Sequence, residues 1–462
     1  MNHHRAVPRA LALAALLVLE LSALTARAGM PRREPPLILG GARPPVTRIV
    51  PIDPRLPTGA HFESKARPPG KMPVCSVIRP LCVHAEPGQA DEAKLALDNL
   101  ELAYDRLVLA LGLPPPHGDG VLGGSAALDA YLTPPSAQLE VHAGEPEPGP
   151  FTEASAFCEL PSGDPFLLTR NATLCVGEAI ALGLDSSETP HLRRAFATWL
   201  WWATGLPTAL DAEAIDTVQA HPERPIGDRD RSASSEGSAL FFEYLETLRS
   251  AASPGELSSA LFAASASPSE PRGLEYVNEP DLFDVLRHSL DEEPARFASL
   301  MIDFTVARAF VGDRDDGLHL PALAWSGDFG RVRFDWSVKF SSLPRRVLVH
   351  PAVDSTGSVL IWLDLDEVAL GSALGLRAEW EPPVSFQWQL VKLGMDGEEL
   401  GRIDIPYQER GRDAEGRISN LEGARAVLIV GTNLEGIDLA HPFDPDVAPF
   451  EPHAATVYLV RM

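Results

Sequence analysis

The spacing of apolar residues changes near residue 330, and this change divides the chain into two parts. In residues 331–340 every second side chain, from Val332 to Phe340, is apolar, and the side chains between them are Arg, Asp, Ser or Lys. Strict alternation is typical of a half-buried β-strand. Six further strands are predicted at 359–365, 374–380, 384–393, 400–405, 425–432 and 455–460, with Asp396-Gly397 as a hairpin turn.

Seven strands at this spacing predict an antiparallel β-sandwich of the immunoglobulin or fibronectin type over residues 330–462. Because the side chains of a strand alternate between two faces, the alternation also identifies the interior. The residues expected inside the sandwich are Phe334, Trp336, Val338, Trp388 and Val430.

Residues 75–320 follow a different pattern, with a few short strands followed by helices. Apolar residues at helical spacing predict a helix at 89–111, and short runs predict strands at 126–132, 138–142 and 155–160. Thr189 followed by Pro190 is a favourable start for a later helix. Helices are predicted at 171–183, 190–204, 235–249, 255–264, 280–290 and 295–311. The whole chain is therefore expected to be α+β, a small sheet with helices followed by the sandwich.

The first 28 residues have the three parts of a secretory signal. Arg5 and Arg9 precede an apolar run from Ala10 to Leu24, and Ala26-Arg27-Ala28 matches a cleavage site. The run is too short to span a bilayer, and no later stretch reaches 18 apolar residues, so no transmembrane segment is expected after cleavage. A buried N-terminal helix is the alternative. The signal predicts a secreted protein, periplasmic or extracellular, and the excess of Arg over Lys is typical of a GC-rich bacterial genome.

Residues 29–74 contain 11 prolines and predict an extended linker. The linker carries eight Lys and Arg against three acidic residues, whereas the whole chain has 39 basic and 64 acidic residues and a net charge of −25. Such an acidic chain argues against nucleic acid as a partner, because a phosphate backbone requires a basic surface. The basic linker is interpreted either as an arm that binds the envelope or as a tether that lies against its own acidic domain.

The four cysteines, Cys75, Cys82, Cys158 and Cys175, are expected to form disulfides in an oxidising compartment. Four cysteines allow three pairings, and we favour the local pairs Cys75–Cys82 and Cys158–Cys175 because each closes a short segment. A zinc site is the alternative, but spacings of 7 and 17 residues do not match the usual C-x₂₋₄-C pattern.

Familiar catalytic motifs are missing from the sequence. No nucleophile elbow, P-loop or dinucleotide fingerprint occurs. The acidic run at 313–317 departs from the EF-hand order and is interpreted as a solvated turn. Asp444 and Asp446, close to His441 and His453, are interpreted as turn residues or as ligands of a divalent ion.

The most informative stretch follows the predicted strands of the middle region. A small sheet, then a helix at 171–182 and a second helix at 190–204, resembles the arrangement of the gluzincin-type zinc metallopeptidases, the peptidase MA-like superfamily. In that family the first helix carries H-E-x-x-H, and a Glu on the second helix is the third zinc ligand. The resemblance covers residues 75–312 and rests on the order and spacing of the elements.

The resemblance implies that every zinc ligand has been lost. Gly177 and Ala181 stand at the two His positions, Glu178 at the Glu position and Thr204 at the third ligand. Neither Gly nor Ala has a donor atom, so neither a metal nor a cofactor is expected. The two helices are expected to lie side by side and to bring these four residues together. Glu178 is interpreted either as an exposed helix residue or as an acid retained in a cleft.

The predicted organisation is a signal peptide at 1–28, a linker at 29–74, a metallopeptidase-like domain at 75–320 and a β-sandwich at 330–462. Its expected function is non-catalytic binding of an unknown protein or envelope component, although the sequence leaves open whether the protein is an enzyme. An active hydrolase with an unrecognised site is the second hypothesis, and a structural or adhesive surface protein is the third. Trp199, Trp201 and Trp202 are interpreted as core residues or as the lining of a binding groove.

Overall fold

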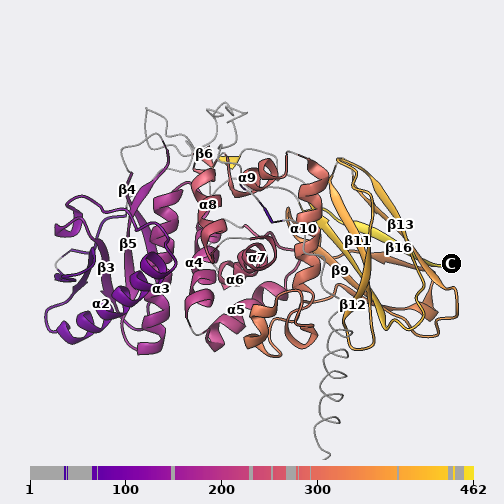
Figure 1. Cartoon of the computed structure of the whole chain (residues 1–462), viewed down its shortest axis with the longest axis horizontal. Helices are drawn as coiled ribbons and strands as arrows, with labels where there is room; N and C mark the ends of the chain where they lie inside the picture. The colour runs from indigo at the N-terminus through magenta and orange to yellow at the C-terminus, as the bar shows by residue number, and fades with distance from the viewer. Residues whose placement is uncertain are drawn as a thin grey trace, which may run out of the picture.

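The computed structural model arranges a small sheet, a layer of helices and two packed sheets from one end of the molecule to the other (Figure 1). The predicted signal peptide at 1–28, together with Asp444 and Asp446, lies outside the residues that the structure describes. The described residues are 36–37, 39, 65–69, 71–146, 151–205, 207–227, 233–250, 253–266, 277–278, 280–291, 293–381, 384–434, 441–442 and 452–462.

A five-stranded sheet with the order β1-β2-β3-β5-β4 forms the N-terminal end of the fold. Its strands are β1 (Met72–Cys75), β2 (Leu81–Ala85), β3 (Leu128–Thr133), β4 (Glu140–Pro146) and β5 (Ala154–Pro161). Strands β2, β3 and β5 are parallel, whereas the edge strands β1 and β4 are antiparallel to their neighbours. The sequence predicted β3, β4 and β5 but not β1 and β2, because both are short and β1 lies in the proline-rich linker.

Helices cover one face of this sheet and continue as a separate layer. The helices are α2 (Ala90–Tyr104), α3 (Pro165–Leu184), α4 (Pro190–Thr204), α5 (Ala209–Gln219), α6 (Ala233–Gly237), α7 (Ala239–Tyr244), α8 (Glu256–Ser265), α9 (Leu282–Ser289) and α10 (Pro294–Arg308). Shorter π and 3₁₀ turns are η1 (Asp105–Ala110), η2 (Leu122–Gly124), η3 (Leu245–Arg249), η4 (Gly312–Arg314), η5 (Pro321–Ser326) and η6 (Phe340–Ser342). As predicted, Thr189 caps α4, and its hydroxyl accepts a hydrogen bond from the backbone N–H of Leu192 at 3.3 Å.

Helix α3 is the core helix of this half of the molecule. It begins at Pro165 rather than at residue 171, because the carboxylate of Asp164 caps it by accepting a hydrogen bond from the N–H of Phe166 at 2.7 Å. Among the described helices, α3 is long and apolar enough to cross a membrane, but 78% of its apolar window is buried inside the protein. Its composition is therefore explained by burial in the core.

Both favoured disulfides are present. Cys75–Cys82 joins β1 to β2 at directly opposed positions, and Cys158–Cys175 joins β5 to α3. The local pairing is confirmed, and the cysteines are not zinc ligands. Disulfides of this kind indicate an oxidising, periplasmic or extracellular setting.

Two sheets make the sandwich-like C-terminal part, with the strand orders β13-β10-β16-β8 and β12-β11-β14-β9-β7. Their strands are β7 (Trp336–Lys339), β8 (Arg345–Leu348), β9 (Ser358–Asp364), β10 (Ala373–Trp380), β11 (Phe386–Leu393), β12 (Glu399–Asp404), β13 (Asp413–Ser419), β14 (Ala426–Asn433) and β16 (Ala455–Arg461). A two-stranded ladder pairs β6 (Val277–Asn278) with β15 (His441–Pro442). The α+β class is confirmed. The two C-terminal sheets agree with the predicted antiparallel sandwich except at one edge, where β7 pairs with β9 in parallel.

The interior of the sandwich differs from the prediction in three positions. Val338 and Trp388 are buried between the sheets as expected. Trp336 is 38% exposed because it starts the edge strand β7, where its indole N–H donates to the carbonyl of Leu348 at 2.9 Å. Val430 is buried, but on the opposite face of its sheet, and Phe334 precedes the strand and packs beside Trp362.

Helix α10 covers that opposite face. Its residues Ile302 and Val306 form a hydrophobic cluster with Leu360, Leu428 and Val430 of β9 and β14. Figure 1 shows α10 standing between the other helices and the sandwich. The expected boundary between 320 and 330 therefore separates two segments that share a core.

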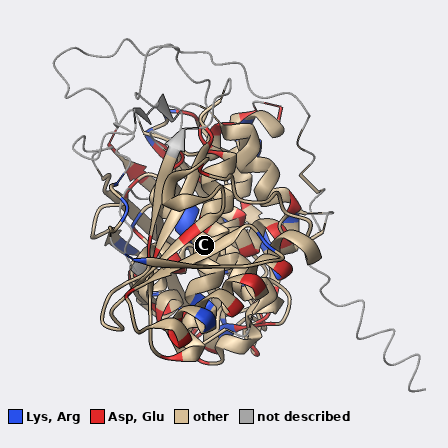
Figure 2. Cartoon of the chain, turned by 90° about the vertical axis from the view of Figure 1, so that its left-hand side faces the viewer, with Lys and Arg blue, Asp and Glu red and all other residues tan. Residues whose placement is uncertain are grey.

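The described parts of the basic linker lie against the rest of the protein. The backbone N–H of Leu37 donates to the carbonyl of Arg249 at 2.8 Å, and Leu37 itself is buried in the helical core. Lys65 and Arg67 form ion pairs with carboxylates of the N-terminal sheet. Acidic positions are spread over the elements visible in Figure 2. The described segments thus fit the tether interpretation.

Candidate functional site

Helices α3 and α4 form a tight antiparallel hairpin. Its turn is fixed by Asp185, whose carboxylate accepts hydrogen bonds from the backbone N–H of Ser187 at 3.0 Å and from its hydroxyl at 2.6 Å. A Cβ placed on Gly177 would lie 3.0 Å from the Cβ of Ala197 and 3.1 Å from its Cα. The two helices therefore touch at Gly177, and they lie side by side as predicted.

The register of this hairpin excludes Thr204 from the expected cluster. Thr204 lies seven residues beyond Ala197, which is about 10 Å further along the helix at a rise of about 1.5 Å per residue. Residues at equal distances from the turn meet in an antiparallel hairpin, so Thr204 lies beside the first half of α3 and not beside Ala181. Its hydroxyl donates to the carbonyl of Leu200 at 2.7 Å. The placement of Thr204 beside Ala181 was wrong because the sequence did not reveal the register.

The residue of α4 that meets Glu178 is Arg194. Its Nε lies 2.6 Å from Oε1 of Glu178, and both side chains are buried. Arg194 is also 3.7 Å from Glu236, which pairs with Arg170 at 2.6 Å. Glu178 is thus neither an exposed helix residue nor an acid in a cleft. We call the following five residues the buried network: Arg170, Glu178, Arg194, Asp211 and Glu236.

The residues present at the positions implied by the resemblance do not fit zinc. Gly177 faces the backbone of α4, with no space for a larger side chain. Ala181 is fully buried and offers no donor atom, and the one carboxylate, Glu178, is paired with the guanidinium of Arg194. Trp199, Trp201 and Trp202 are buried as core residues, as one of the two interpretations proposed.

A pocket of about 350 Å³ lies elsewhere, where the end of α10 meets the sandwich. We call it the arginine pocket. Asp313 and Arg314 of η4 contribute from the helical side, and Trp362 of β9 contributes from the sandwich. Its lining residues are Ala309, Phe310, Asp313, Arg314, Arg331, Phe334, Ser337, Trp362, Leu393, Asp396, Gly397, Arg425 and Leu428.

Positive charge gathers in the arginine pocket. Arg331 pairs with Asp313 at 3.2 Å, whereas Arg314 and Arg425 have no carboxylate within ion-pair distance among the described residues. Burial, and then the charges of Arg331 and Arg425, lower the pKa of Arg314 to about 10, although Asp313 acts in the opposite direction. Arg314 still carries its proton at neutral pH, so the pocket holds cationic side chains that repel one another.

An aromatic pair forms part of the same wall. The rings of Phe334 and Trp362 lie 5.4 Å apart, and the guanidinium carbon of Arg314 lies 4.2 Å above the centre of Phe334. The guanidinium of Arg425 lies 5.9 Å from the ring centre of Trp362. A guanidinium stacked on a ring keeps its N–H groups in its own plane, where they are available to an acceptor.

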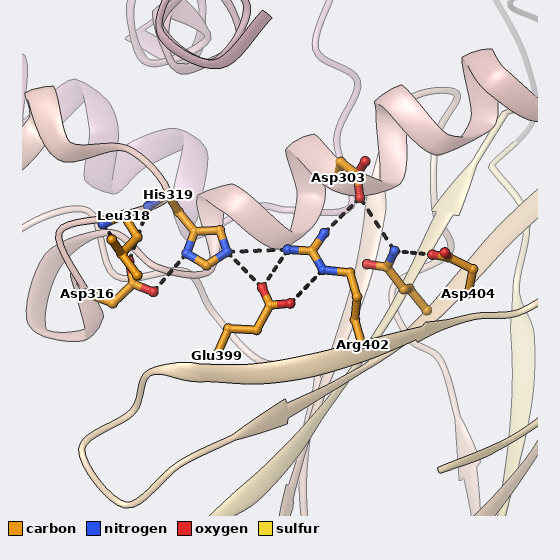
Figure 3. Close-up of polar contacts among 8 residues, drawn as sticks. Asp303, Asp316, Leu318, His319, Glu399, Arg402 and Asp404 are labelled. Atoms are coloured by element: carbon orange, nitrogen blue, oxygen red, sulfur yellow. Dashed lines mark hydrogen bonds and ion pairs between the residues drawn. The ribbon is translucent and has the colours of Figure 1, made fainter. Parts of the chain in front are cut away.

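A polar cluster around His319 (Figure 3) lies beside the arginine pocket, in the segment that follows Asp313 and Arg314. His319 ends this segment, and its ring stacks on Phe310 with ring centres 3.9 Å apart. Its Nδ1 lies 2.8 Å from Asp316, and its Nε2 lies 2.9 Å from Glu399 of β12. Arg402 bridges the same Glu399, at 2.5 Å, to Asp303 of α10, at 2.8 Å. We call His319, Asp316, Glu399, Arg402 and Asp303 the His319 latch.

The His319 latch joins a helix, a loop and a sandwich strand through charge. Burial by itself would lower the pKa of His319, but the hydrogen bonds to Asp316 and Glu399 outweigh it and raise the pKa. Burial would raise the pKa of Glu399, but the hydrogen bonds from His319 and Arg402 lower it to about 2. An imidazole between two carboxylates satisfies both only when it is protonated, because each nitrogen must then donate.

Sequence reasoning missed the arginine pocket because its residues are spread over several segments between 309 and 428. Two patterns in the sequence include residues of the pocket, although neither pattern identifies a site. The run at 313–317 has the composition of a solvated turn, yet it contains both Asp313 and Arg314. The alternation at 331–340 predicts one long strand, whereas the strand covers Trp336–Lys339 and leaves Arg331 and Phe334 in the pocket wall.

Comparison with protein-family models finds no match, and comparison with curated proteins finds none either. Among solved structures, the pre-peptidase C-terminal domain of a collagenase from Bacillus anthracis is 9% identical, with 28% of this chain and 97% of that chain covered and a TM-score of 0.18. The enzymatically active domain of tailspike protein 4 from bacteriophage CBA120 is 10% identical, with 24% and 15% covered and a TM-score of 0.17. A CBM4 structure is 15% identical, with 26% and 80% covered and a TM-score of 0.14. TM-scores this low carry no argument about this chain.

Proposed function

We propose that this protein is a secreted, non-catalytic binding protein, and that its ligand site is the arginine pocket. The proposed ligand is an acidic saccharide of the envelope or the extracellular space. One observation carries the proposal: Arg314 and Arg425 line an open pocket beside the aromatic pair Phe334 and Trp362, with no carboxylate within ion-pair distance of either arginine among the described residues.

The chemistry of the pocket suits a ring that bears an anionic group. A guanidinium binds carboxylate or sulfate through two parallel hydrogen bonds, and burial beside an aromatic wall strengthens them. The rings of Phe334 and Trp362 offer an apolar surface for the face of a sugar. A volume of about 350 Å³ is within the range of small-molecule sites.

The relationship to gluzincin-type metallopeptidases is part of the same proposal. Its support is the order of a small sheet followed by the α3–α4 hairpin, in which Glu178 lies at the expected position on the core helix. In this proposal the scaffold has lost its metal, and Arg194 supplies the positive charge that faces Glu178. The assignment of the sandwich to the immunoglobulin or fibronectin type, and secretion through residues 1–28, belong to the proposal as well.

The experiment is calorimetric titration of the full chain with two oligosaccharides of equal length. Hyaluronan hexasaccharide carries carboxylates, and maltohexaose is the neutral control. We expect binding of the acidic sugar alone, and a loss of about tenfold or more in affinity for Arg314→Met and for Trp362→Ala. Arg377→Met is the matched control, because Arg377 lies on β10 in the other sheet and pairs with Glu379 at 2.9 Å.

Three outcomes would contradict the proposal. They are equal binding of both sugars, no binding of either, and unchanged affinity in the Arg314→Met variant. Hydrolysis of the hexasaccharide by the wild-type protein would instead favour the hydrolase hypothesis. Chromatography of the sugar after the titration detects that outcome.

A further inference from the structure

The outer face of the N-terminal sheet carries ionisable side chains. Val141 and Cys158 of β4 and β5 point into the helix-covered core. Glu140, His142 and Glu159 therefore lie on the other face, because successive side chains of a strand alternate. Glu140 and Glu159 are directly opposite each other in the antiparallel pair. Like charges at opposed positions destabilise a sheet, so this pair requires a cation between its members.

A cation is already present at this position. The ammonium of Lys65 lies 2.7 Å from Oε1 of Glu159, 3.1 Å from Oε2 of Glu140 and 3.2 Å from Nε2 of His142. Lys65 comes from the tether and is 75 residues from Glu140 in the sequence. The three acceptor atoms therefore converge on one point, and a positive charge occupies it.

The acceptor atoms are also spaced as zinc ligands are. Nε2 of His142 lies 3.3 Å from Oε2 of Glu140 and 3.5 Å from Oε1 of Glu159, and all three atoms are within 4.8 Å of one another. Zinc binds N and O ligands at about 2.0–2.2 Å, which separates neighbouring ligands of a tetrahedron by roughly 3.3–3.6 Å. Two of the three separations therefore match without movement of the strands.

We infer that Glu140, His142 and Glu159 form a site for a divalent ion of the zinc type, for which Lys65 is a built-in competitor. One imidazole and two carboxylates supply three ligands and leave a fourth position for water. Metal and ammonium require the same three atoms, so binding of the metal displaces Lys65 from the sheet. Arg67, which pairs with Asp129 at 3.1 Å, still holds the tether two residues further on.

This site is separate from the metallopeptidase-like positions and from the arginine pocket. It lies on strands of the N-terminal sheet, not on the helices that carry Gly177 and Glu178, and it contains none of the residues of the arginine pocket. The inference does not rest on the proposed saccharide function.

The test is titration of the untagged, metal-stripped full chain with zinc chloride in a calorimeter. We expect one zinc per chain, and an affinity about tenfold higher in the Lys65→Ala variant, because the competitor is removed. His142→Ala and Glu159→Gln are expected to lose the site. His350→Ala, at an exposed histidine far from the cluster in sequence, is the control and is expected to bind like the wild type.

A second measurement follows the tether itself. Trypsin cleaves after Lys65 more readily once its ammonium is free, so zinc is expected to accelerate cleavage of the Lys65–Ala66 bond in the wild type but not in His142→Ala. The inference is overturned if Lys65→Ala fails to bind zinc while its circular dichroism spectrum is unchanged. It is overturned equally if His142→Ala binds zinc as the wild type does.

Discussion

The buried network and the arginine pocket both depend on arginine, but their charges are arranged in opposite ways. In the buried network, Arg170 and Arg194 meet the carboxylates of Glu178, Asp211 and Glu236 in the helical core. In the arginine pocket, Arg314, Arg331 and Arg425 face the carboxylates of Asp313 and Asp396 beside solvent. Paired and buried charge of the first kind stabilises the fold, whereas the excess of charge at the open pocket is the feature on which our proposal of a ligand site rests.

The largest expected effect comes from breaking the pairing in the buried network. Arg194→Met leaves Glu178 buried without the cation that faces it, so we expect the free energy of unfolding to fall by about 3–5 kcal/mol. Urea denaturation followed by circular dichroism measures this loss. The double variant Glu178→Leu/Arg194→Met should recover most of it, because no charge is then left unpaired. Equal stability of the single variant and the wild type would show that the pair is not structural.

An effect of intermediate size is expected from the His319 latch, which is paired like the buried network but contains a histidine whose pKa is raised by its two carboxylate partners. The folded pKa of His319 is raised, so its stabilisation is fully present below pH 6.5 and is lost as pH rises through the folded pKa. Glu399 acts in the other direction, because its stabilisation is present above pH 4.5 and is lost as pH falls toward 2.

The measurement is the urea midpoint of the wild type and of His319→Asn at pH 5.5 and pH 8.5. We expect His319→Asn to be less stable by about 1.5–3 kcal/mol at pH 5.5, the usual contribution of a hydrogen bond to a charged group. The difference between the two proteins should shrink at pH 8.5. A difference that is constant between the two pH values would mean that folding does not raise the pKa of His319.

The smallest effect on stability is expected in the arginine pocket, where an arginine that is not needed for the fold is removed. Arg314→Met removes a charge that is repelled by Arg331 and Arg425, so we expect the free energy of unfolding to change by less than about 0.5 kcal/mol, or to rise slightly. The same variant is expected to lose saccharide binding. A fall of several kcal/mol would place Arg314 among the structural arginines and remove the contrast between the two sites.

Local features of this fold could be predicted from the sequence, whereas contacts between distant segments could not. Thr189 followed by Pro190 predicts the start of α4, because capping depends on residues next to each other. The local disulfides follow from short separations in the same way. The partner of Glu178 depends on the hairpin register, which small residues such as Gly177 determine only once the helices are packed. The sequence therefore predicts Thr204 as the neighbour of Glu178 on α4, whereas the structure places Arg194 there.

The arginine pocket was even harder to predict from the sequence than the partner of Glu178. Arg314 and Trp362 are separated by almost 50 residues and come from a 3₁₀ turn and a β-strand. Alternation of polar and apolar residues indicates which side of a strand is buried, but not which loop covers it. Neither residue lies in a motif, so only their meeting in space identifies the site.

The sharing of a core by α10 and the sandwich has a consequence for how the chain is made. The ribosome completes α10 at Arg308, long before it reaches β14 at Ala426. Until β14 is present, β9 and β11 lack the strand that joins them into one sheet, so the apolar face with Ile302 and Val306 is incompletely covered on a newly made chain. Truncation of the chain between these two elements is therefore expected to leave an exposed apolar face that favours aggregation.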